Sequence, residues 1–222
     1  NKIYKMSKIE KFRYHYNNCE QSVKTYDHLL ENSDILDIGS NVGFFSEAII
    51  KNVNYKSIHL FEPSKEYFNY SKNNVLLRNC SNIFFNNYGL GDTNSTSTLY
   101  KSPNDNIGWN TFYKKDPMHA TDFIDTMNNE SCTIKKLDDY KIENVDFIKI
   151  DVEGFEDKVI KGGLQLIKKF KPYILVEVGW GTSHPDWGGC LKIYNQLFDI
   201  GYEKVDFKSY TEDILFKPKD KK

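Results

Sequence analysis

A glycine turn between a short apolar run and a helical pattern is the part of this sequence best suited to hold a ligand. The run at 34–38 has the pattern of a strand covered on both faces, and Gly39 then lets the chain turn where a side chain would clash. Gly43 opens an apolar helical stretch, whose first backbone N–H groups favour a negative group such as a carboxylate. The sequence therefore predicts a small-molecule site at this turn.

Two acidic residues extend the predicted site. Asp37 lies at the end of the first strand, where it can face an ammonium group directly or through water. Glu62 follows the next predicted strand, at 57–61, and a carboxylate there can accept hydrogen bonds from both hydroxyls of a ribose. With the turn, this spacing resembles the S-adenosylmethionine site of class I methyltransferases, so methyl transfer is the expected activity.

Two other interpretations of the turn are weaker. A plain strand, turn and helix with a solvated acid would explain the glycines alone, but it gives no reason for Asp37 together with Glu62. A nicotinamide dinucleotide site requires the pattern G-x-G-x-x-G, so that the backbone can approach a pyrophosphate. Asn41 stands where the second glycine would be, which disfavours a dehydrogenase.

Predicted strands alternate with predicted helices along the chain. Strands are expected at 34–38, 57–61, 82–86, 145–150, 173–178, 203–207 and 213–216, with a further one at 131–137. Helices are expected at 7–31, 43–52, 64–77, 155–170 and 190–200. This alternation indicates an α/β, Rossmann-like fold of the class I methyltransferase type, with a mostly parallel seven-stranded sheet and helices on both faces. We divide the chain into an N-terminal helical extension, residues 1–33, and a methyltransferase domain, residues 34–222.

Charge, hydropathy and cysteine usage limit the classes of function. The net charge is −1, from 30 basic and 31 acidic residues, which gives no field suited to a nucleic-acid partner. No run of eighteen apolar residues occurs, so we expect no membrane partner. The four cysteines are scattered without a C-x-x-C pair, which is typical of reduced thiols and a cytoplasmic location. The sequence gives no indication of the oligomeric state.

The strand at 145–150 leads to the residues best suited to chemistry. Alternation places Lys149 and Asp151 on one face, and a lysine inside an apolar strand is costly unless it is paired. For Lys149 alone we prefer a buried salt bridge, with Asp151 or Glu177 as its partner. Asp151 also lies at the strand end, where the methyl donor is expected. Asp151, Glu177 and His184 are therefore the candidates to take a proton from an acceptor alcohol.

A metal could serve the same purpose. Asp151 and Glu177 could hold a Mg²⁺ ion that lowers the pKa of the acceptor hydroxyl. Two carboxylates that are separated in the sequence do not form a metal-binding signature, so we expect a reaction without a metal.

Four segments, at 37–46, 61–64, 87–92 and 147–156, resemble the FkbM-type methyltransferases. The segment FIKIDVEGFE is the most distinctive, because the first two segments occur in many methyltransferases. The resemblance covers about residues 34 to 180. It implies an S-adenosylmethionine-dependent O-methyltransferase that acts on hydroxyl groups of sugars, glycans or polyketide-type metabolites.

The resemblance also implies roles for individual residues. The methyl donor would be held by Asp37, Gly39, Ser40, Asn41, Gly43, Glu62 and Pro63, with Asn87 near the adenine. Asp151 and Glu153 would face the acceptor or brace the site. The acceptor contacts would come from Lys149, Glu153, Trp109 and Asn110, since aromatic faces stack well on sugar rings.

We therefore expect an S-adenosylmethionine-dependent O-methyltransferase that acts on a sugar or glycan hydroxyl. The low net charge and the aromatic content of 15% suit a neutral sugar. One alternative is methylation of a small phenolic or polyketide metabolite, which would favour a metal site and a more apolar pocket. The other is a non-catalytic binding module that retains the fold. The intact Asp37, Gly39, Gly43 and Glu62 argue against this last interpretation.

Overall fold

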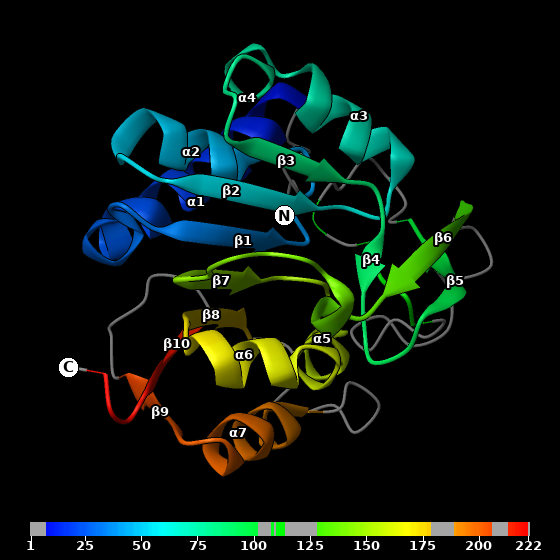
Figure 1. Ribbon diagram of the computed structural model, residues 1–222. Coiled ribbons are helices and arrows are strands. Elements are labelled where there is room, and N and C mark those ends of the chain that lie inside the picture. The colour runs from blue at the N-terminus through cyan, green and yellow to red at the C-terminus, as the bar shows by residue number, and fades with distance from the viewer. Residues whose placement is uncertain are drawn as a thin grey trace, which may run out of the picture.

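The computed structural model of the protein describes residues 8–101, 108, 110–113, 128–178, 189–205 and 213–221. Seven strands form one sheet in the order β3-β2-β1-β7-β8-β10-β9 (Figure 1). In chain order they are β1 (Asp34–Ile38), β2 (Ser57–Phe61), β3 (Ile83–Asn86), β7 (Phe147–Ile150), β8 (Tyr173–Glu177), β9 (Tyr202–Val205) and β10 (Asp213–Pro218). Neighbouring strands are parallel except at β10, which is antiparallel to β8 and β9. The expected fold class is confirmed.

Helices cover both faces of this sheet (Figure 1). One face is covered by α1 (Lys8–Leu30), α2 (Phe44–Asn52) and α4 (Val75–Arg78). The other is covered by α5 (Glu156–Gly162), α6 (Leu164–Phe170) and α7 (Gly189–Asp199). Side chains alternate between the two cores, so that Ile35 and Phe147 face the first layer of helices and Leu36 and Ile148 face the second. Burial on both faces explains why these strands are continuous apolar runs.

Two predicted helices are each divided in the structure. The helix expected at 64–77 is α3 (Lys65–Asn73) followed by α4, because Asn74 has an extended backbone and its side chain accepts the Leu76 N–H. The helix expected at 155–170 is α5 followed by α6, with Gly163 between them. Both breaks occur at residues with low helix propensity.

A second sheet was not expected from the sequence. It has the strand order β4-β6-β5 and consists of β4 (Gly89–Leu90), β5 (Ser95–Tyr100) and β6 (Asn129–Lys135). It lies beyond the carboxyl ends of β2 and β3 (Figure 1). Strand β5 is a polar Ser/Thr run with little apolar alternation, so the sequence pattern predicted no strand there.

The N-terminal helix α1 belongs to the same core as the sheet. Val23, Tyr26 and Leu30 are fully buried, in one cluster with β1, β2 and α2. The division of the chain at residue 33 stays a prediction. Among the residues that the structure describes, no helix is both long and apolar enough to span a bilayer.

Candidate active site

A cavity of about 740 Å³ lies at the carboxyl ends of the parallel strands. Its wall is formed by the ends of β1, β2, β7 and β8, by residues of the small sheet, and by one side of α1. In open α/β sheets this is the position where ligands bind. Of the predicted site residues, the cavity brings together Asp37, Gly39, Ser40, Asn41, Glu62, Pro63, Asn110, Lys149, Asp151, Glu153 and Glu177.

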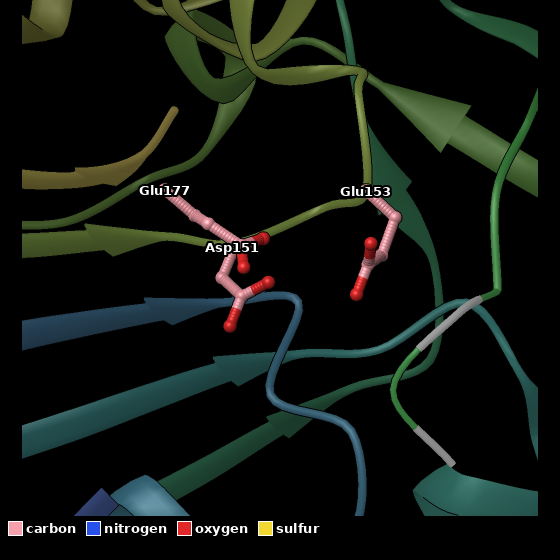
Figure 2. Close-up of side chains that lie close together, drawn as sticks. All are labelled: Asp151, Glu153 and Glu177. Atoms are coloured by element: carbon pink, nitrogen blue, oxygen red, sulfur yellow. The ribbon is translucent and has the colours of Figure 1, made fainter. Parts of the chain in front are cut away.

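Three carboxylates converge on one side of the cavity (Figure 2). Asp151, Glu153 and Glu177 each place an oxygen within 4.8 Å of the others. Asp151 and Glu177 lie beside each other at the ends of β7 and β8, and Glu153 turns toward them from the loop after β7 (Figure 2). Burial raises the pKa values of Glu153 and Glu177 well above their usual range, and the charge of Asp151 adds to both shifts.

Lys149 supplies a positive charge beside this cluster of carboxylates. Its Nζ lies 2.7 Å from Asp151 Oδ2, which confirms the expected buried salt bridge. Burial alone would raise the pKa of Asp151, but Lys149 and a hydrogen bond from Glu177 hold it below its usual value. Burial likewise opposes the charge on Lys149, and Asp151, Asp37 and Asp213 together raise its pKa above normal. Asp151 is therefore ionised and Lys149 protonated at neutral pH.

The spacing of the three carboxylates would suit a divalent cation, but one of them is already paired within the chain, because Lys149 lies beside Asp151. We assign no metal to these residues, and the reaction without a metal stays a prediction.

The loop that carries Glu153 is braced by a further acid of the same motif. Glu153 and Gly154 both have positive φ, of 54° and 96°. The carboxylate of Glu156 accepts hydrogen bonds from the Val152 and Gly154 N–H groups, at 3.0 and 3.1 Å. Thr111 Oγ1 also donates to the Glu153 carbonyl at 2.8 Å. These bonds give Glu156 a structural role in orienting Glu153.

On the other side of the cavity, Gly39 brings two strand ends into contact. Its backbone has φ +79°, and a Cβ atom added there would lie 1.8 Å from the Asp151 carbonyl oxygen. The Gly39 and Ser40 N–H groups both donate to the Phe61 carbonyl. The turn therefore fixes the end of β1 against the ends of β2 and β7, as a glycine without Cβ allows.

The N–H groups of the turn that leads into α2 already have partners within the chain. The Asn41 N–H donates to Glu62, the Val42 N–H to the Asn41 side chain, and the Gly43 N–H to the Ser40 carbonyl. Gly43 does not line the cavity; a Cβ there would lie 2.7 Å from Leu77 Cδ1. Gly43 shapes the turn, and its predicted role in donor binding stays a prediction.

Asp37 is fully buried, and only one of its carboxylate oxygens accepts a hydrogen bond within the described residues. Its Oδ2 accepts a hydrogen bond from Ser46 Oγ at 2.6 Å, and Oδ1 has no hydrogen-bond partner among the described residues. Burial raises the pKa of Asp37, while Lys149 and Ser46 oppose that shift. A buried carboxylate oxygen without a donor is costly, so this position suits a ligand that brings a positively charged donor.

Glu62 is held by backbone groups on both of its oxygens. Oε2 accepts the Asn41 N–H at 2.9 Å and Oε1 accepts the Ser64 N–H at 2.7 Å. Burial raises the pKa of Glu62 to about 8, against the lowering effect of these two hydrogen bonds. Each carboxylate oxygen can accept a further hydrogen bond, so the fixed side chain can still bind a ribose hydroxyl.

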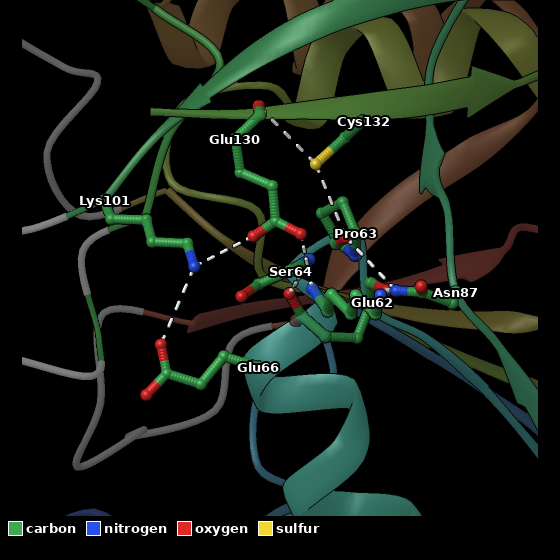
Figure 3. A network of polar contacts seen from close by, with 9 residues as sticks. Glu62, Pro63, Ser64, Glu66, Asn87, Lys101, Glu130 and Cys132 are labelled. Carbon is green, nitrogen blue, oxygen red and sulfur yellow. Dashed lines mark hydrogen bonds and ion pairs between the residues drawn. The ribbon is translucent and has the colours of Figure 1, made fainter. Parts of the chain in front are cut away.

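The small sheet fixes the turn that carries Glu62 (Figure 3). Glu130 of β6 accepts the Lys65 N–H at 2.9 Å and pairs with Lys101, which also reaches Glu66. Cys132 Sγ donates to the Pro63 carbonyl at 3.4 Å.

Asn87 fixes the same turn from the end of β3. Its side chain donates to the Glu62 and Pro63 carbonyls, at 2.9 and 3.2 Å, and it does not line the cavity (Figure 3). Contact of Asn87 with the adenine stays a prediction.

Several cavity residues were missed by sequence reasoning. They are Tyr14, His15, Asn18, Cys19 and Ser22 of α1, Phe112, and Asp213 of β10. The apolar stripe of α1 was visible in the sequence, but nothing local showed where its polar side would lie. The predicted site residues Trp109 and His184 lie outside the described residues.

A Rossmann-like sheet with a glycine turn, a buried Asp37 and a fixed Glu62 defines a class I methyltransferase fold. Residues 37–204 match the family described as the methyltransferase FkbM domain. The match covers more than half of the chain, and the chain belongs to this family. The family implies S-adenosylmethionine as the cofactor, as the sequence predicted, and the unpaired oxygen of Asp37 fits its ammonium group.

Individual relatives agree with this assignment. "Methyltransferase 1" from Beauveria bassiana (strain ARSEF 2860) is 26% identical over 147 residues, which cover 60% of this chain and 59% of the relative. This chain therefore spans about three fifths of that protein. Among solved structures, methyltransferase FkbM from Methylobacillus flagellatus KT has a TM-score of 0.55 at 15% identity, covering 94% of this chain and 58% of its own. A candidate S-adenosylmethionine-dependent methyltransferase from Methanococcus maripaludis has a TM-score of 0.53 at 15% identity, covering 96% and 89%. These structural likenesses show the fold.

Proposed function

We propose that this protein is an S-adenosylmethionine-dependent O-methyltransferase that transfers a methyl group to a hydroxyl group of a sugar or glycan. The observation that carries the proposal is the environment of Asp151. Its side chain is 34% exposed, it lines the same cavity as Asp37 and Glu62, and Lys149 keeps it ionised. An ionised carboxylate beside a donor site can orient a hydroxyl group for transfer.

The donor side of the cavity, with Asp37 and Glu62, would bind and orient the methyl donor. Asp37 would accept a hydrogen bond from the ammonium group, and Glu62 would accept the ribose hydroxyls. When bound, S-adenosylmethionine supplies a methyl group that is already activated by a positively charged sulfur. Positioning is then the main task of the protein, and orientation alone can contribute roughly 7–11 kcal/mol.

The acceptor side supports a polyhydroxyl acceptor better than a phenol. Carboxylates of Asp151, Glu153 and Glu177 offer several hydrogen-bond acceptors, and the aromatic rings of Tyr14 and Phe112 line the same cavity. Sugars combine hydroxyl donors with an apolar ring face, so this mixture of groups suits them. A small phenolic or polyketide acceptor would offer fewer hydroxyl groups and would leave more of these carboxyl oxygens without a partner.

The proposal is tested in two steps with the purified protein. Isothermal titration with S-adenosylhomocysteine, with NAD as the control ligand, should show binding of the first alone. Radiolabelled S-adenosylmethionine should then label neutral sugars or glycans more strongly than matched phenols. Binding of NAD instead would remove the methyltransferase assignment. Donor binding without transfer to any acceptor would favour the non-catalytic binding module.

The remaining sequence-based expectations belong to the same proposal. The absence of a nucleic-acid or membrane partner, and the cytoplasmic location, stay predictions.

A further inference from the structure

One side of α1 forms a polar wall of the cavity. The residues that line it are Tyr14, His15, Asn18, Cys19 and Ser22. Their spacing of three to four residues places them along one side of the helix. This side covers the sheet face that carries Asp37, Lys149 and Asp151, because those side chains point away from the core occupied by α5, α6 and α7.

His15 places an imidazole in the wall of the cavity that the three carboxylates also line. It is partly buried and lines the cavity together with Asp151, and its positive charge contributes to lowering the pKa of Asp151. An imidazole titrates near neutral pH, where it can both accept and release a proton. The charged and titratable groups that share this side of the cavity are Tyr14, Cys19, Asp37, Lys149, Asp151, Glu153, Glu177 and Asp213.

The other groups on this side are poorly suited to accept a proton at neutral pH. Burial and neighbouring charges raise the pKa values of Glu153 and Glu177 well above their usual range, which favours their protonated forms. Burial raises the pKa of Cys19 to about 12. Lys149 is protonated, and Asp151 is a weak base because its pKa lies below the usual value. A general base works best when its pKa lies near the working pH, and an imidazole is the side chain whose ordinary pKa lies closest to neutrality.

We propose that His15 is the general base that accepts the proton of the acceptor hydroxyl, with Asp151 stabilising the imidazolium that forms. In this step the acceptor oxygen bonds to the methyl carbon, the carbon–sulfur bond breaks with its electron pair passing to sulfur, and the hydroxyl proton moves to His15 and then to water. The inference rests on the proposed function, because it needs an acceptor with an ionisable hydroxyl.

The test compares His15→Gln with His28→Gln in the full chain. His28 lies on the same helix, but it is exposed and outside the cavity, so its substitution should leave turnover unchanged. His15→Gln should lower kcat about 10²–10⁴-fold, the usual contribution of a general base, and should remove the rise of kcat between about pH 5.5 and 7.5. Both variants should bind S-adenosylhomocysteine as the wild type does, because His15 lies on the acceptor side.

A second measurement does not depend on turnover. Titration of the His15 imidazole by NMR should give a midpoint that moves to lower pH in Asp151→Asn, because the neighbouring negative charge is lost. An unchanged midpoint would overturn the pairing.

Turnover of His15→Gln within twofold of the wild type, with donor binding intact, would overturn the base assignment and leave the proposed function standing. Failure of the wild type to bind S-adenosylhomocysteine would overturn the proposed function instead, and the base assignment with it.

Discussion

The two sides of the cavity, which we propose to bind the methyl donor and the acceptor and call the donor side and the acceptor side, are built in different ways. The donor side is formed by backbone groups close in sequence: the Gly39 turn, and the N–H groups of Asn41 and Ser64 that hold Glu62. The acceptor side is formed by charged side chains from distant elements, Lys149 and Asp151 at β7 and Glu177 on β8. We therefore expect the donor side to be most sensitive to changes in backbone shape, and the acceptor side to changes in charge.

The largest effect is expected at Gly39. Gly39→Ala would place Cβ 1.8 Å from the Asp151 carbonyl oxygen, so the ends of β1 and β7 must separate. We expect a loss of at least about 4 kcal/mol in the free energy of unfolding, measured by urea titration, and loss of S-adenosylhomocysteine binding.

Gly201→Ala is the matched control for this variant. Gly201 also has positive φ, of +87°, but nothing lies within 4 Å of the added Cβ. That substitution should cost about 1–2 kcal/mol, from the left-handed backbone alone. Equal losses at the two glycines would show that the contact between strand ends is unimportant.

The second largest effect is expected on the acceptor side. Lys149→Met removes the cation that pairs with Asp151, and leaves Asp37 without its opposing charge. Breaking a buried pair in this way costs about 3–5 kcal/mol in the free energy of unfolding. The double variant Lys149→Met/Asp151→Asn should recover part of that loss. A single variant as stable as the wild type would mean that the pair contributes little.

The same pair predicts how stability depends on pH. Because the pKa of Asp151 is lower in the folded protein than in the unfolded chain, where it is about 3.8, Asp151 stabilises the fold at pH values above about 3.8. This contribution is lost as the pH falls through the lower pKa of the folded state. The raised pKa of Lys149 stabilises the fold below about 10.5, and this contribution is lost at higher pH. Urea titrations should therefore show that Lys149→Met loses most relative to the wild type between these two values.

A smaller effect is expected from Glu62. At pH 8.5, where Glu62 is mostly ionised, Glu62→Gln should weaken S-adenosylhomocysteine binding about 10–100-fold, because hydrogen bonds to a charged acceptor contribute about 1.5–3 kcal/mol each. Since the pKa of Glu62 is about 8, wild-type affinity should rise as the pH increases toward 8, and Glu62→Gln should lose this dependence. Calorimetric titration between pH 6.5 and 8.5 measures both. Glu66→Gln, on the exposed end of the same network, is the control and should bind normally.

This contrast also explains what could be predicted from the sequence. The Gly39 turn, Asp37 and Glu62 lie at strand ends within one stretch of chain, so alternation and turn chemistry were enough to bring them together. The pairing of Lys149 followed from the cost of a lysine in an apolar strand. The sheet was predictable for the same reason, because its strands are continuous apolar runs.

The parts that could not be predicted depend on contacts between distant elements. The polar strand β5 is held by β6 through backbone pairing, which leaves no apolar pattern to detect. The network of Lys101 and Glu130 that supports Glu62 depends on that second sheet. His15 likewise reaches the site because α1 packs across the sheet, and the spacing within α1 contains no information about that direction.

Removal of divalent metal ions is expected to have no effect on turnover. Three ionised carboxylates this close together would favour a bound cation, but burial raises the pKa values of Glu153 and Glu177, which favours their neutral forms, and Lys149 pairs with Asp151. Turnover measured after dialysis against EDTA should therefore stay within about twofold of the untreated enzyme, with added Mg²⁺ giving no stimulation. Inactivation that Mg²⁺ restores would mean that the carboxylates ionise together around a metal. The acceptor hydroxyl would then be activated by that metal, and His15→Gln should have little effect on turnover.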